Sequence, residues 1–114
     1  MQQSVNVASN AKMIEALKAE FISESADVLR AALSPCGRGE LLDALGSSVF
    51  LAYVLARRCG ITFAELDEDI AQKASSGIEE GHMLESSFGD LSLLKKHFES
   101  GIIRGFGEDK KRRL

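Results

Sequence analysis

One segment of this chain, apolar on nearly every face, constrains the fold more than any other feature. It runs from Leu41 to Ala56, inside a helix expected over residues 40–58 that ends at a left-handed Gly60. A helix that is apolar all round is central and is covered by neighbouring elements on most sides. Its length and its Leu and Ala content argue against a strand. We therefore expect a helical protein built around this segment.

The segment before it has the pattern of an amphipathic helix over residues 11–33. Apolar residues recur there three, four and seven positions apart, and Asn10 stands where an N-cap is expected. Ser34-Pro35 ends this helix, because a residue before proline is pushed out of the α region. A short Gly-containing turn then leads into the central helix.

Two further helices are predicted in the second half of the chain. Thr62 and Glu65 form a capping-box pattern at the start of a helix over residues 63–75. Residues 78–86 either extend that helix or form a loop. The last helix is predicted over residues 89–100, where apolar residues recur at helical spacing.

The pattern predicts an all-α fold, a bundle of about four helices joined by short loops. A chain of 114 residues holds one domain. We assign residues 1–9 to a flexible N-terminus, 10–103 to a single all-α domain and 104–114 to a basic flexible tail. Helix 40–58 carries more apolar surface than one short bundle covers, so we expect oligomerisation to complete the bundle, as a homodimer or a dimer of dimers.

Charge is distributed unevenly along the chain. Residues 1–94 hold 7 basic and 14 acidic side chains, whereas residues 95–114 hold 7 basic and 3 acidic ones. An acidic body is a poor surface for phosphates of DNA or RNA, so a nucleic-acid partner is not expected. The longest unbroken apolar run has eight residues, and a membrane-spanning helix needs about 20. No secretory signal is evident either, and we expect a cytoplasmic protein without a membrane partner.

The two cysteines, Cys36 and Cys59, flank the central helix. At about 1.5 Å per residue, a helix of this length holds its ends about 30 Å apart. A disulfide needs Cα atoms within about 7 Å, so reduced thiols are expected. The two cysteines and two histidines are too scattered to form a zinc site.

Carboxylates beside the apolar stripes are the feature that points to chemistry. Glu24, Glu20 and Asp27 share one shoulder of the first predicted helix, and Glu40 and Asp43 lie at the start of the central helix. Antiparallel packing across the 34–39 loop brings the end of the first helix beside the start of the second. We therefore expect four carboxylates to converge at this end of the two helices.

Two interpretations of this cluster stay open from the residues alone. Converging carboxylates remain ionised together only beside a cation, and oxygen ligands on rigid helices suit Mg²⁺ or Mn²⁺. Magnesium also recruits phosphate oxygens, which favours a phosphorylated substrate. In the alternative, the carboxylates are solvated surface groups and the chain is a non-catalytic helical oligomerisation or interaction module.

The spacing of the carboxylates resembles that of the MazG-like all-α nucleotide pyrophosphohydrolases. That family has an E-x-x-E pair and an E-x-x-D pair on two consecutive helices. Here Glu24-Ser25-Ala26-Asp27 is followed by twelve residues and then by Glu40-Leu41-Leu42-Asp43. The sequence Ile61-Thr62-Phe63-Ala64-Glu65-Leu66, leading to Lys73, is also similar to the family. The resemblance covers about residues 14–74.

The resemblance implies a Mg²⁺-dependent hydrolase, with Mn²⁺ as a possible substitute. Such an enzyme cleaves (d)NTPs or related nucleotides between the α and β phosphates and releases a monophosphate and pyrophosphate. It implies four metal ligands, Glu24, Asp27, Glu40 and Asp43. Glu40 and Asp43 are also the two candidates for the catalytic residue that orients the attacking water. Lys73 is a candidate contact to a substrate phosphate, and the alternative is a solvated lysine at a helix end.

Two alignments of the second motif are possible. Asp43 precedes Gly60 by 17 positions, and a gapless match to the family from Gly60 places Ser47 in the position of the last Asp. Four residues are about one helical turn, so both alignments keep the same helix face. The first motif also differs from the family, because Asp27 stands in place of a Glu.

Overall fold

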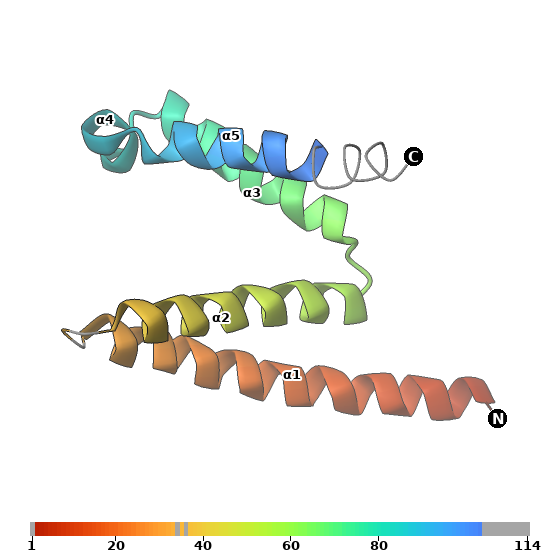
Figure 1. The fold of residues 1–114 in the computed structure, drawn as a ribbon. Coiled ribbons are helices and arrows are strands. Elements are labelled where there is room, and N and C mark those ends of the chain that lie inside the picture. The colour runs from red at the N-terminus through yellow and green to blue at the C-terminus, as the bar shows by residue number, and fades with distance from the viewer. Residues whose placement is uncertain (1, 34, 36, 104–114) are drawn as a thin grey trace, which may run out of the picture. The chain divides into compact units, whose positions relative to one another are not determined.

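The computed structural model describes residues 2–33, 35 and 37–103, and this part of the chain holds five helices and no strand. The prediction of an all-α fold is confirmed. The chain divides into two compact units, residues 1–63 and 64–114 (Figure 1). Whether they form the one domain expected over 10–103 stays a prediction. The expected tail, 104–114, lies outside the described residues.

Helix α1 spans Gln2–Leu33 and is longer than expected. It ends directly before Ser34-Pro35, as the sequence predicts, but it begins well before residue 11. Asn10 is therefore not an N-cap. Its amide instead links the two helices of the first unit, donating to the Arg58 carbonyl oxygen at 3.2 Å and accepting from the Arg58 guanidinium at 3.3 Å. Asn10 therefore lies within α1 and connects it to the end of α2, whereas the sequence predicted that it begins the helix.

Helix α2 spans Arg38–Arg58 and ends in a Schellman motif. Gly60 has a φ of 88°, and its N–H donates to the Arg57 carbonyl at 3.1 Å. The Ile61 N–H donates to the Ala56 carbonyl at 2.8 Å. These two bonds satisfy carbonyls that the helix end leaves without partners, and they need a residue that tolerates positive φ. The predicted role of Gly60 is confirmed.

The two helices of the first unit form an antiparallel hairpin (Figure 1). The buried residues are mostly small, which lets the helix axes approach closely: Leu17 and Ala31 on α1, and Ala44, Leu51 and Ala56 on α2. Larger apolar side chains of α2 stay outside this interface, for example Leu42 at 62% and Phe50 at 66% exposure. Within the first unit α2 therefore leaves large apolar side chains uncovered, and whether other elements or a second copy cover them stays a prediction. In this unit α1 is the helix that packs along α2, so the buried stripe of α2 is narrow.

Among the described helices, α2 is the one long and apolar enough to cross a membrane by length and composition alone. The same test is passed by core helices of soluble proteins, so it is weak evidence for a span. Charged residues lie at both ends and in the first turns of α2, including Glu40 and Asp43.

The second unit contains most of α3 (Phe63–Glu79), with α4 (Met83–Phe88) and α5 (Asp90–Ile103). Helix α3 begins where the capping box predicts but runs four residues beyond its predicted end. It stops because Gly81, at a φ of 71°, provides the left-handed position after the helix. Residues 78–86, which the sequence left open, contain the end of α3, a turn and part of α4.

Two local contacts position α4 and α5. The His82 Nδ1 accepts a hydrogen bond from the Leu84 N–H at 3.0 Å and so caps α4. The Glu85 carboxylate accepts from the Ser92 N–H at 2.8 Å and from the Ser92 hydroxyl at 2.6 Å. Because Ser92 lies in the first turn of α5, Glu85 satisfies one of the donors that a helix start leaves unpaired.

The hydrogen bonds from the Ser92 hydroxyl and N–H lower the pKa of Glu85 below its usual value of 4.5. Such a carboxylate stabilises the fold above its unfolded-state pKa, and the contribution is lost as pH falls through the lowered pKa. We expect Glu85→Gln to lower the melting temperature at pH 7. The difference from the native chain should shrink below about pH 4 and is measured by thermal unfolding from pH 7 to pH 3. A difference that does not change with pH would contradict this role for Glu85.

Candidate functional site

A pocket of about 350 Å³ lies in the first unit, between the C-terminal half of α1 and the first turns of α2. It is lined by four carboxylates, one arginine and two alanines: Glu24, Asp27, Arg30, Ala31, Glu40, Asp43 and Ala44. The antiparallel hairpin explains this convergence, because the connection between Leu33 and Arg38 is short and the end of α1 therefore lies beside the start of α2. No such pocket would form if the helices diverged at the turn.

Helical spacing places each polar side chain of the pocket beside a buried alanine. On α1, Asp27 lies three positions after Glu24 and four before Ala31, and on α2, Ala44 lies four positions after Glu40, so these residues share one face of each helix. Ala31 and Ala44 are buried between the helices. Glu24 and Asp27 are half-buried, whereas Glu40 and Asp43 are exposed. The carboxylates therefore stand at the edge of the helix interface, within reach of solvent.

All four predicted metal ligands line this one pocket. Glu20, the fifth carboxylate considered in the sequence, is exposed on α1 and does not line it. Ser47, the alternative to Asp43, does not line it either. In one alignment the last residue of the second motif, Asp43, lines the pocket, and in the other that residue, Ser47, lies about one helical turn further along α2. Which alignment holds stays a prediction.

The donor set suits a hard divalent cation in kind, since Mg²⁺ and Mn²⁺ prefer carboxylate oxygens. Among the described residues, no three Asp, Glu, His or Cys side chains lie close enough together to hold a metal ion as they stand. The backbone positions nevertheless place four carboxylates around one pocket. Rotation of the Glu24 and Glu40 side chains moves their oxygens without moving either helix. The residues therefore fit a cation in type, and their side chains would have to rotate to bring three of them around one ion.

Arg30 is a pocket residue that the sequence analysis missed. Its guanidinium forms an ion pair with the Asp27 carboxylate; the Arg30 side chain is 69% exposed and the Asp27 side chain is half-buried, at 46% exposure. The available signal was the three-residue spacing between these opposite charges on one helix. Among the described residues, Glu24, Glu40 and Asp43 have no side-chain partner of this kind. Asp27 is therefore the one carboxylate of the four that already has a counter-charge.

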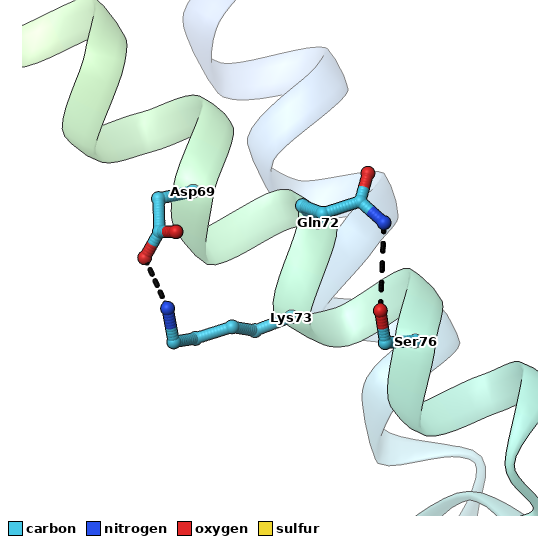
Figure 2. A network of polar contacts seen from close by, with 4 residues as sticks. All are labelled: Asp69, Gln72, Lys73 and Ser76. Atoms are coloured by element: carbon cyan, nitrogen blue, oxygen red, sulfur yellow. Dashed lines mark hydrogen bonds and ion pairs between the residues drawn. The ribbon is translucent and has the colours of Figure 1, made fainter.

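Lys73, the predicted phosphate contact, belongs to the second unit. Its ammonium pairs with the Asp69 carboxylate one turn earlier on α3 (Figure 2). Gln72 and Ser76 form a parallel contact on the same helix, at 3.4 Å. An exposed pair at this spacing is a common feature of helix surfaces and contributes about 0.3–0.5 kcal/mol. The substrate role of Lys73 stays a prediction.

A sequence model of the MazG-like family matches residues 7–91. This range contains the whole pocket and both of its motifs. No curated protein and no solved structure shows a significant match to the chain. The family match is a match of sequence, and it covers most of the first unit and part of the second.

Proposed function

We propose, because the chain belongs to the MazG-like family, that it is a divalent-metal-dependent nucleotide pyrophosphohydrolase. Its substrates are (d)NTPs or related nucleotides, and its products are a nucleoside monophosphate and pyrophosphate. Mg²⁺ is the proposed cofactor and Mn²⁺ a substitute. One observation supports this proposal above the others: the two acidic motifs, twelve residues apart in sequence, line a single pocket.

The residues of the pocket have two proposed roles, metal binding and orientation of the attacking water. Glu24, Asp27, Glu40 and Asp43 would hold the cation. A bound divalent cation polarises phosphoryl oxygens and lowers the pKa of an attacking water. A carboxylate that is not fully engaged as a ligand can accept a proton from that water and orient it. Glu40 and Asp43 are the proposed candidates, because both are exposed and neither has a partner among the described side chains.

The test of this proposal is a screen for pyrophosphate release. The full chain is incubated with the standard and modified nucleoside triphosphates, with Mg²⁺ and with a chelator. Cleavage between the α and β phosphates gives monophosphate and pyrophosphate in equal amounts, whereas cleavage of the terminal phosphate gives a diphosphate and inorganic phosphate. Equal yields of the first pair with Mg²⁺ alone support the proposal, and no release from any nucleotide would contradict it.

We also propose that the chain assembles as a homodimer or a dimer of dimers. Large apolar side chains remain exposed on both helices of the first unit: Met13, Ile22, Leu29, Leu42, Leu45, Val49 and Phe50. Apolar surface of this extent is unusual on an isolated soluble protein and marks a contact surface. A second copy of the chain is the proposed source of the covering residues.

Sedimentation is expected to give at least twice the chain mass of 12.3 kDa at micromolar concentration. Phe50→Glu should shift the protein toward the monomer, because it places a charge among apolar side chains that a partner covers. Glu68→Gln, on the exposed surface of α3, is the control and should leave the mass unchanged. A native chain that sediments at 12.3 kDa would contradict the assembly.

The exposed apolar side chains of α1 and α2 also favour a second candidate function, a non-catalytic interaction module. The effect of metal ions on the melting temperature distinguishes the hydrolase from the interaction module. A site of four carboxylates should be stabilised by millimolar Mg²⁺ or Mn²⁺, since a ligand that binds the native state raises its stability. An interaction module with solvated carboxylates should show no shift in melting temperature with either ion.

A further inference from the structure

We propose that Arg30 is a phosphate-binding residue of the pocket, and that its ion pair with Asp27 is exchanged when metal and substrate bind. The inference rests on the proposed function for the identity of the ligands. The choice of residue rests on this structure. Arg30 lines the pocket and forms an ion pair with Asp27, one of the four predicted metal ligands.

The charge of the pocket creates the need for such a residue. Four carboxylates and one guanidinium line it. Without a bound cation the net charge of this lining is negative and repels the phosphates of a nucleotide. Arg30 is the one positively charged side chain among the described residues that line the pocket. Lys73 lies in the other unit and pairs with Asp69 there. Within the pocket, Arg30 is thus the protein group that can attract a phosphate.

The geometry of the pair makes the exchange easy. Arg30 and Asp27 lie one turn apart on α1, with Arg30 exposed and Asp27 half-buried, and ion pairs that are open to solvent contribute little to stability. A divalent cation competes with the guanidinium for the Asp27 carboxylate, because both are attracted to the same oxygens. The guanidinium that is released stays in the pocket, since its helix does not move. Its planar donors suit bidentate contact with phosphate oxygens.

Two binding measurements on Arg30→Gln test this exchange, with Lys18→Gln as a matched control. Lys18 pairs with Glu15 at the same spacing on the same helix, and it lies outside the pocket. The control therefore removes the same charge and the same type of ion pair. Calorimetry is used to measure the affinity for Mn²⁺ and, in saturating Mn²⁺, the affinity for inorganic pyrophosphate.

Arg30→Gln is expected to bind Mn²⁺ about twofold to fivefold more tightly than Lys18→Gln, which corresponds to the loss of one exposed competing ion pair. It should bind pyrophosphate about tenfold more weakly or worse, because a charge-assisted contact is lost. Arg30→Lys should recover part of the pyrophosphate affinity through its charge. Equal affinities of Arg30→Gln and Lys18→Gln for both ligands would overturn the proposal.

The outcomes separate this inference from the proposed function. If the native chain binds Mn²⁺ and releases pyrophosphate from nucleotides while Arg30→Gln behaves like the control, only the role of Arg30 fails. If the expected affinity changes occur but no nucleotide is cleaved, the exchange stands and the catalytic proposal fails. If the native chain binds no Mn²⁺ at millimolar concentration, both fail together.

Discussion

Glu24→Gln is expected to abolish most of the stabilisation that Mg²⁺ or Mn²⁺ gives to the native chain. A ligand at a hundred times its Kd stabilises a protein by about 2.7 kcal/mol, which for a chain of this size raises the melting temperature by roughly 10 °C. An amide oxygen is a much weaker ligand than a carboxylate for a hard dication. Without added metal the variant should be as stable as the native chain or more so, because an amide does not repel the other three carboxylates.

Glu20→Gln is the matched control for this experiment. Glu20 lies one turn before Glu24 on α1, is exposed and does not line the pocket. Its substitution should change stability by less than about 0.5 kcal/mol, with or without metal. Thermal unfolding of both variants in a metal titration gives the comparison. If they respond identically to Mg²⁺ and Mn²⁺, the carboxylates of the pocket do not act as one metal site.

Asp43→Asn is expected to lower the rate of pyrophosphate release by about a hundredfold or more, the typical effect of removing a catalytic carboxylate. Ser47→Ala, one turn later on α2, should stay within about twofold of the native rate, because Ser47 does not line the pocket. The comparison decides between the two alignments of the second motif. A large loss with Ser47→Ala and none with Asp43→Asn would show that the pocket residues have been assigned in the wrong register.

The helices were predictable because their signals are local. Pro35 and Gly60 mark boundaries that the structure keeps, and the capping box at Thr62 marks the start of α3. The start of α1 was not predictable from Asn10, because a residue with good capping chemistry is instead used in a contact 48 positions away. The end of α3 was misplaced for a related reason. Gly77 lies inside the helix and Gly81 ends it.

Gly77 shows why sequence alone misassigned that helix end. A Cβ at this position would lie 2.5 Å from the Leu91 side chain, so the residue is small because α5 approaches α3 there. Glycine can therefore mark a close contact as well as a turn, and the difference depends on tertiary packing.

The candidate site was predictable to the level of which carboxylates meet, since helix periodicity and a short turn determine that much. Arg30 was not identified, because a charge three residues from Asp27 is common on exposed helices and its significance depends on the pocket beside it. What covers the apolar faces of α2 was not predictable for a similar reason. An apolar pattern indicates surface that requires a partner, and it does not distinguish a helix of the same chain from one of a second copy.

The most direct test of the central claim is the position of Mn²⁺ in crystals of the full chain grown or soaked with the ion. Anomalous scattering locates the metal independently of any assay. The account predicts a peak between α1 and α2, ligated by carboxylates from both acidic motifs, Glu24 and Asp27 on one helix and Glu40 and Asp43 on the other. A peak elsewhere on the surface, or no ordered peak at millimolar Mn²⁺, would contradict it.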